Sequence, residues 1–246
     1  MRALGVMLLL CAPAAAVAQS LGLPGLDIRI DAAEAKPAEV ATALKILAVL
    51  TALTLAPAAL VVMTAFTRII VVLAMLRMAI GMQETPPNSV LVSLALFLTL
   101  FTMQPVLSQI DSQAFQPYVA GRMGFERAAS AALQPVREFM IRQTRETDLM
   151  LMLDVSHAEP PQSAEEVRTV HLVPAFMLSE LKTAFQIGFV VFLPFLLLDI
   201  VVSSILMSMG MLMVPPMMIS LPLKLLMFVL IDGWNLVVKA LLGSFR

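Results

Sequence analysis

Long runs without a charged residue constrain this chain more than any other feature of its sequence. Residues 46–67 form one such run of 22 residues, residues 85–110 form a second, and residues 200–223 form a third of 24 residues. A helix needs about 20 apolar residues to cross the hydrocarbon core of a bilayer. Charged residues make up only 13% of the 246-residue chain, against roughly a quarter in soluble domains. The sequence therefore predicts an all-α integral membrane protein.

The N-terminus has the form of a secretory signal peptide. Arg2 supplies a short basic region, residues 4–11 are apolar, and Ala16-Val17-Ala18 supplies the small side chains of a cleavage site. Cys11 would suit a lipoprotein signal, but the large leucine before it argues against that alternative. We expect residues 1–18 to be cleaved, which removes the only cysteine and leaves no disulfide or thiol ligand.

Composition divides the remainder of the chain into four parts. Pro57 should kink or divide the first apolar run, because a proline inside a helix lacks one hydrogen-bond donor. Pro174 suits the first position of a later helix. The predicted order is a periplasmic N-terminal segment over residues 19–40, a first helical hairpin over 41–110, a polar periplasmic helical segment over 111–173, and a second helical hairpin with a methionine-rich loop over 174–246.

The orientation in the membrane follows from the predicted signal peptide. With the N-terminus outside the cytoplasm, Arg68 and Arg77 lie on the cytoplasmic side against one acid, Glu84, in agreement with the positive-inside rule. Hydropathy then predicts four membrane passages. The polar segment would lie in the periplasm, and the turn near Leu212 would face inward.

Ionisable residues inside the apolar runs are the first candidate functional residues. Such groups are costly in lipid and usually face a bundle interior, a partner or a cavity. Asp199 lies 13 residues before Leu212 and Lys224 lies 12 residues after it. An antiparallel hairpin turning there would place the two at similar depth, so we predict an ion pair between them.

Three further charged residues belong to this set. Glu180 and Lys182 are two residues apart and do not share a helix face, so we expect them to reach separate partners. Asp232 lies about 12 Å from Lys224 along a helix, so it needs another chain, Lys239 or water as its partner. Packing against other subunits in a hetero-oligomer explains these charges better than a proton relay.

A dense group of methionines lies at the turn of the second hairpin, in the sequence SMGMLMVPPMMIS of residues 208–220. Thioethers bind Cu(I), methionine fills cores, and flexible apolar rings close pores by dewetting, so three interpretations are open. A period of two, with Gly210, Pro215 and Pro216, favours a loop over a helical core. Copper-handling proteins usually add cysteine or histidine ligands to their methionines, and this sequence offers none beside the cluster, which argues against copper. The alternating methionines are Met207, Met209, Met211 and Met213.

Motifs of enzymatic chemistry are missing from the sequence. It has no GxxxxGK[ST] phosphate loop, no HExxH, no GxSxG and no CxxC. His157 and His171 are too isolated to indicate a metal site, and a net charge of −1 gives no reason to expect nucleic-acid binding. We therefore expect no catalytic residues, no cofactor and no metal.

Four segments of the chain are long and together very specific. They are SELKTAFQIGF, GMLMVPP and LPLKLLMFVLIDGW in the second hairpin, and FTRIIVVLAMLRMAIGMQETPPNSVLVSLALFLTLF in the first. These segments resemble the FliP family, a core component of the flagellar type III export gate. The resemblance covers about residues 41–245. Virulence type III secretion has a close relative, the SctR family, but the signal peptide and the extended lead-in are more similar to the flagellar branch.

The resemblance implies an assembly in the cell inner membrane. Five such subunits would join FliQ and one FliR in a closed helical pore within the flagellar basal body, which receives unfolded export substrates. Much of the apolar hairpins would then lie above the membrane plane, so a four-passage topology would mislead. Energy would come from an ATPase and the proton-motive force elsewhere in the apparatus.

The resemblance also implies that the methionine-rich loop is a gasket against leakage. The family often has three consecutive methionines there, whereas this chain has Met211-Leu212-Met213, which keeps an apolar seal with less flexibility. The competing classes are a small-molecule or copper transporter and a purely structural ring component. The predicted gasket is Met209, Met211, Leu212 and Met213, the loop-shaping residues are Gly210, Pro215 and Pro216, and the polar assembly residues are Glu180, Lys182, Asp199, Lys224 and Asp232.

Overall fold

The computed structural model describes most of the chain after residue 36. The described ranges are residues 37–82, 84–159, 161, 163, 166–211 and 213–245. All regular structure within them is helical and none is strand, so the predicted all-α class is confirmed. The predicted signal peptide and Leu212 of the predicted gasket lie outside the described residues.

The chain divides into two units, residues 1–52 and residues 53–246, and helix α1 (Pro37–Val62) passes from the first into the second. Pro57 does not divide this helix, because the hydrogen bonds on both sides of the single missing donor persist. The chain instead leaves the helix at residues 63–65. The remaining helices all belong to the second unit.

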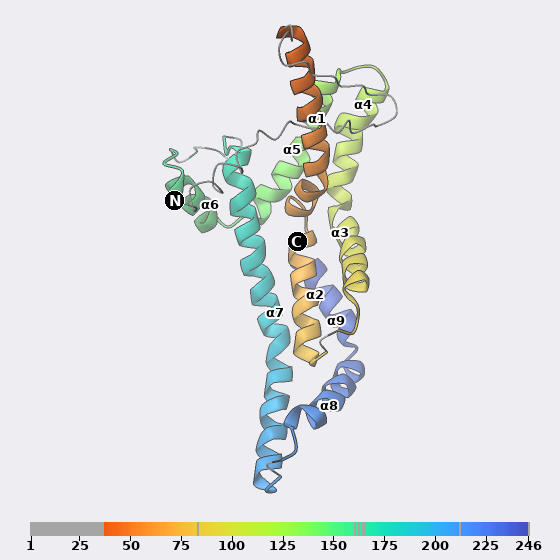
Figure 1. Cartoon of the computed structure of the whole chain (residues 1–246), viewed down its shortest axis with the longest axis vertical. Helices are drawn as coiled ribbons and strands as arrows, with labels where there is room; N and C mark the ends of the chain where they lie inside the picture. Colours follow the sequence, from red (N-terminus) through yellow and green to blue (C-terminus); the bar gives the residue numbers. More distant parts are fainter. Residues whose placement is uncertain are drawn as a thin grey trace, which may run out of the picture. The chain divides into compact units, whose positions relative to one another are not determined.

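Helix α2 (Phe66–Ile80) is the centre of the second unit. It packs against α3 (Asn88–Ile110) and α7 (Thr169–Ser208), and Figure 1 shows it between them. Its buried face supplies Ile69, Val72 and Leu73, which are fully excluded from solvent. Gly81 ends α2 with φ 91°, a left-handed conformation that glycine adopts without steric cost. Helices α2 and α3 thus form the first hairpin.

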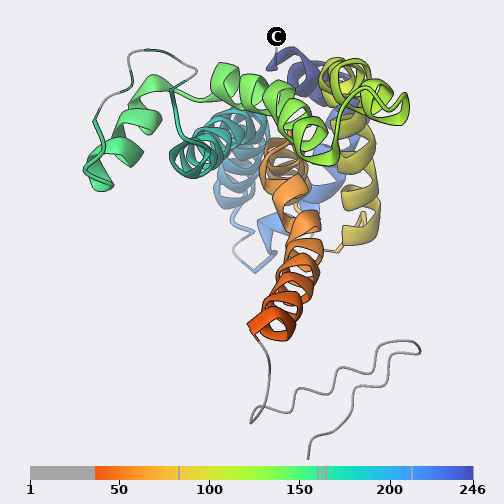
Figure 2. The same cartoon turned by 90° about the horizontal axis from the view of Figure 1, so that it is seen from above.

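The polar segment caps one end of these helices. A π-helical turn, η1 (Asp111–Phe115), continues α3 into α4 (Gln116–Val119), and α5 (Phe125–Gln143) follows. Figure 2 shows α5 running across the ends of α2, α3 and α7. Its own residues Phe139 and Met140 are buried, and the short helix α6 (Glu146–Val155) packs on α7.

The second hairpin consists of α7 and α8 (Pro216–Leu230), and α9 (Gly233–Gly243) follows after a bend of 66°. The expectation that Pro174 opens α7 is wrong, because the helix begins at Thr169. The Arg137 guanidinium donates to the Val167 carbonyl and the Thr169 hydroxyl, and this tertiary contact holds the additional turn.

Fewer helices meet the criteria for a membrane passage than the four predicted. Within the described residues, two are long and apolar enough, Asn88–Val119 and Thr169–Ser208, and a third is obtained if the bent α8–α9 pair counts as one span. At about 1.5 Å per residue, the 40-residue α7 is about 60 Å long, roughly twice the thickness of a hydrocarbon core. Much of α7 therefore extends beyond the apolar layer of any bilayer that it crosses.

Candidate functional site

The methionine-rich loop joins the ends of α7 and α8. Helix α7 ends at Ser208, Met209 caps it, and Gly210 turns the chain with φ 74°. Nothing lies within 4 Å of the position where a Gly210 side chain would project. Pro215 precedes α8 in an extended conformation and Pro216 is its first residue, where the missing N–H has no helical acceptor to lose.

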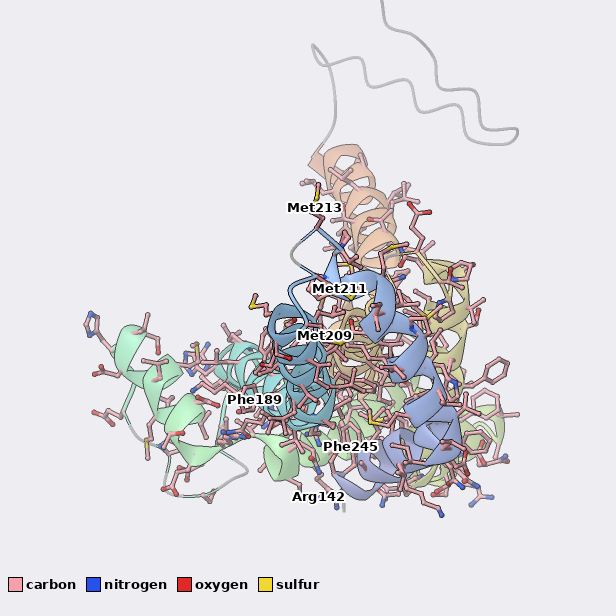
Figure 3. The ribbon with its side chains drawn as sticks, turned by 90° about the horizontal axis from the view of Figure 1, so that it is seen from below. Arg142, Phe189, Met209, Met211, Met213 and Phe245 are labelled. Carbon is pink, nitrogen blue, oxygen red and sulfur yellow. The ribbon has the colours of Figure 1, made fainter. Side chains whose placement is uncertain are left out.

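The methionine side chains of this loop are exposed. Met213 is 97% exposed, and Met209 and Met211 are exposed as well. Figure 3 shows all three along the loop, with Met213 pointing away from α7 and α8. Burying such large apolar side chains is favourable by about 1.5–3 kcal/mol each, so their exposure marks a surface that gains from a partner.

The predicted ion pair between Asp199 and Lys224 is confirmed. The Lys224 ammonium donates to Asp199 Oδ2 at 2.6 Å and to the carbonyl oxygen of Ala79 at 3.2 Å. Lys224 is buried, whereas Asp199 is partly exposed. One ammonium therefore joins α7, α8 and the end of α2.

Glu180 pairs with Arg68 inside the helical body. Both side chains are buried, and Arg68 Nε donates to Glu180 Oε2 at 2.8 Å while Nη2 donates to Oε1. The same guanidinium donates to the carbonyl of Ser244 at 2.7 Å and to Gln143 Oε1 at 2.9 Å, and it lies 3.8 Å from the centre of the Phe245 ring. This Arg68 cluster connects α2, α5, α7 and the C-terminal residues.

Lys182 pairs with Asp148 on α6, so the expectation of separate partners for Glu180 and Lys182 is confirmed. The Ser179 hydroxyl also donates to Asp148 Oδ2 at 2.8 Å. Burial alone would raise the pKa of Asp148, but the hydrogen bonds from Lys182 and Ser179 and the charges of Lys182 and Arg145 together hold its pKa below the usual value. Asp148 is therefore an anionic link between α6 and α7.

Asp232 occupies the corner between α8 and α9. It has φ 52°, a left-handed conformation that aspartate tolerates better than most residues, and it caps α9. Its partner within the chain is Asn235, whose Nδ2 donates to Asp232 Oδ2 at 2.9 Å, rather than Lys239. Asp232 thus shapes the bend through its backbone as well as its carboxylate.

Arg68 is the residue whose partners the sequence did not predict. It is only 2% exposed, and every N–H of its guanidinium has an acceptor. The available signal was its position beside eight apolar residues, since a charge in such a run needs an internal partner. Asp148, Gln143 and Phe245 carried no comparable signal.

The sequence model of the FliP family matches residues 49–241. The chain belongs to the FliP family. The matched region contains the Arg68–Glu180 and Asp199–Lys224 pairs and the methionine-rich loop, so these features lie in the part of the chain that FliP proteins share.

Individual FliP proteins are similar over most of their length. The chain is 49% identical over 209 residues to the flagellar biosynthetic protein FliP of Bacillus subtilis, covering 85% of this chain and 95% of that protein. It is 54% identical over 199 residues to that of Pectobacterium carotovorum, covering 81% and 77%. It is 51% identical over 202 residues to that of Cereibacter sphaeroides, covering 82% and 67%.

Proposed function

We propose that this chain is a core pore-forming subunit of the flagellar type III protein export gate, which passes unfolded flagellar proteins across the inner membrane. The observation that carries the proposal is the family match over residues 49–241, together with relatives named as flagellar biosynthetic proteins. The role is that of a conduit and scaffold, without catalysis. The equivalent subunit of a virulence secretion system is the alternative.

The methionine-rich loop seals the closed pore in this proposal. Its support is the exposure of Met209, Met211 and Met213 at the tip of a hairpin, where copies arranged around an axis would bring the thioether side chains together. Methionine is flexible and apolar, so such a ring excludes water and ions and still deforms around a passing chain. Leu212 would contribute one further apolar side chain to each copy.

Assembly with copies of itself, FliQ and FliR accompanies this role. Each ion pair joins two residues of the same chain, so it contributes by holding in place the surfaces that neighbouring subunits contact. The pairs are Asp199–Lys224, Arg68–Glu180 and Asp148–Lys182. Asp232 contributes through the bend between α8 and α9. The α7 helix, about 60 Å long, suits an assembly that rises above the bilayer from a base in it.

The order of segments along the chain also belongs to the proposal. Cleavage of residues 1–18 leaves the N-terminus in the periplasm, followed by residues 19–40. The first hairpin, residues 41–110, and the second, residues 174–246, then enclose the polar residues 111–173, which form the periplasmic rim. Topology reporters fused within the polar segment and at the methionine-rich loop test this order.

Export of flagellar proteins tests the function directly. Deleting the gene from its host should leave hook and filament proteins inside the cell and abolish swimming, and expression of the full chain should restore both. The exposed-surface variant Glu138→Gln serves as the matched control and should restore export fully. Normal flagellar export by the deletion strain would overturn the proposal, and loss of virulence effectors alone would favour the alternative.

A further inference from the structure

Helix α7 continues well past the end of the helix that it packs against. Arg68 contacts Glu180, 112 residues away, and Met75 meets Gly188 at nearly the same separation, so α2 and α7 lie side by side and run in the same direction. This register places Ile80, the last residue of α2, beside residues 192–193. Figure 1 shows the remainder of α7 extending beyond α2 with only α8 alongside.

We call residues 195–230 the arm, and the rest of the second unit the body. The arm comprises the end of α7, the methionine-rich loop and α8. Its base is held together internally, because the Phe195 and Phe228 rings pack with centres 6.3 Å apart and Asp199 pairs with Lys224. A hairpin fastened in this way moves as one piece.

The chain passes from the body into the arm at Pro194, inside α7. A proline has no N–H, so the Val190 carbonyl one turn earlier lacks its helical donor at this point. The missing bond falls at the level where α2 ends and its support of α7 ceases. Bending of α7 is therefore cheapest at the base of the arm.

The chain passes back from the arm into the body at the bend around Asp232. The chain turns by 66° between α8 and α9, and Asp232 adopts φ 52°. A side chain on Gly233 would lie 2.2 Å from the Phe228 ring, so only glycine fits against that ring. Phe228 also packs edge-on against Trp234, with ring centres 5.5 Å apart. The bend is thus a compact corner, where the Asp232 N–H donates to the Val229 carbonyl and the Asp232 carbonyl accepts from Leu236 N–H, both at 3.2 Å.

The arm is held to α2 by fewer hydrogen bonds than hold the helices of the body to one another. Arg68 clamps α2, α5, α7 and the C-terminal residues with hydrogen bonds from all of its N–H groups. In the part of the chain that the structure describes, the arm has one hydrogen bond to α2, from Lys224 to the Ala79 carbonyl at 3.2 Å. Releasing that bond leaves apolar packing, such as that of Phe228 on Trp234, to hold the arm, while the body stays clamped by hydrogen bonds.

We propose that the arm is a lever that pivots as one piece on the body at Pro194 and Asp232, with Lys224 as the latch that holds it to the end of α2. The tip lies about 20 Å from the Pro194 pivot, so a rotation of about 15° moves the methionine-rich loop by about 5 Å. The proposal concerns how a single chain bends, and it stands whether or not the chain forms an export pore.

Distances between spin labels on the full chain test the lever. The arm–body pair is Ile205→Cys with Leu133→Cys, the arm pair is Ile205→Cys with Met218→Cys, and the body pair is Leu133→Cys with Met78→Cys, all at exposed positions. Each pair is made with Cys11→Ser and diluted with unlabelled chain in nanodiscs. Double electron–electron resonance then reports distances within one chain, independently of export and leakage.

Two variants are predicted to shift the arm in opposite directions. Lys224→Met keeps the aliphatic stem and removes both the latch and the pair with Asp199, so the packing of Phe195 on Phe228 must hold the arm together. The displaced arm population should rise roughly tenfold, which corresponds to about 1.4 kcal/mol. Pro194→Ala supplies the missing donor at an exposed position and should narrow the arm–body distance distribution. The control variant Lys239→Met, at an exposed lysine of α9, should leave the distance distributions of all three spin-label pairs unchanged.

The arm pair and the body pair should keep their wild-type distributions in every variant. An unchanged arm–body distribution in Lys224→Met or in Pro194→Ala overturns the lever. Equal broadening of all three pairs also overturns it, because the chain would then be loosening throughout rather than pivoting.

Discussion

Arg68 and Glu180 form a buried ion pair across 112 residues of sequence, with Arg68 Nε donating to Glu180 Oε2 at 2.8 Å. The pair lies where α2 and α7 begin to run side by side, and Gln143 and Ser244 accept the remaining donors. Because every N–H of the guanidinium is satisfied, the arrangement is specific in geometry as well as in charge. It fixes the register from which the arm departs further along α7.

Replacing Glu180 should therefore destabilise the whole helical body. In Glu180→Gln the Arg68 charge stays buried without its anion, and breaking a buried pair in this way costs about 3–5 kcal/mol. The thermal unfolding temperature of the purified chain in detergent should fall clearly below that of Glu138→Gln, an exposed control on α5. Equal unfolding temperatures in the two variants would contradict a structural role for the pair.

Two of the three ion pairs that the structure describes on α7 differ in whether the sequence predicted them. Asp199 and Lys224 lie on the two helices of one hairpin. The position of the turn therefore fixed their relative depth, and the pair was predictable. Arg68 and Glu180 lie on different hairpins, and their meeting depends on how α2 packs on α7. Side-chain spacing within one helix does not encode that register, so the second pair was missed.

Helix types were predictable from the long apolar runs, whereas helix boundaries depended on tertiary contacts. Pro174 is a reasonable helix start by local chemistry, yet Arg137 on α5 holds the chain in helical form from Thr169. The methionine-rich loop was predictable because Gly210 and the two prolines are strong local signals. Hydropathy predicted four membrane passages, whereas two or three of the described helices are long and apolar enough to cross a bilayer.

Acidification should release α6 from α7. The pKa of Asp148 is lowered in the folded chain, so its stabilisation is complete above its ordinary pKa of about 3.9 and is lost as the pH falls through the lowered value. The difference in unfolding temperature between the wild type and Asp148→Asn should be present at neutral pH and vanish in strong acid. A constant difference across that range would show that Asp148 does not act through its charge.

Enlarging Gly188 should force α2 and α7 apart. A side chain there would lie 2.3 Å from the sulfur and 3.2 Å from Cβ of Met75, and the latter atom cannot swing away. Overpacking of this kind costs about 1–3 kcal/mol, so Gly188→Ala should lower the unfolding temperature. Gly243→Ala is the matched control, because nothing lies within 4 Å of its added carbon. If Gly188→Ala unfolds like this control, the two helices are not closely packed at Gly188.

Removing the thioethers should open the proposed seal. The triple replacement of Met209, Met211 and Met213 by alanine shortens the apolar side chains at the loop tip, so the purified complex should conduct small ions in planar bilayers while it still assembles. Met78→Ala, at an exposed methionine of α2, should conduct as the wild type does. An unchanged conductance in the triple variant would exclude the gasket role.

Exchanging the charges of Asp199 and Lys224 should restore part of the assembly that Lys224→Ala loses. Lys224→Ala leaves Asp199 without its cation and Ala79 without a donor, so recovery of the assembled complex by size-exclusion chromatography should fall. The double variant Asp199→Lys with Lys224→Asp rebuilds the ion pair, but a carboxylate at position 224 cannot donate to the Ala79 carbonyl, which accepts from the lysine at 3.2 Å in the wild type. Recovery should therefore lie between the single variant and the wild type. Recovery no better than that of Lys224→Ala would show that the pair contributes nothing to assembly, and full recovery would show that the bond to α2 contributes nothing.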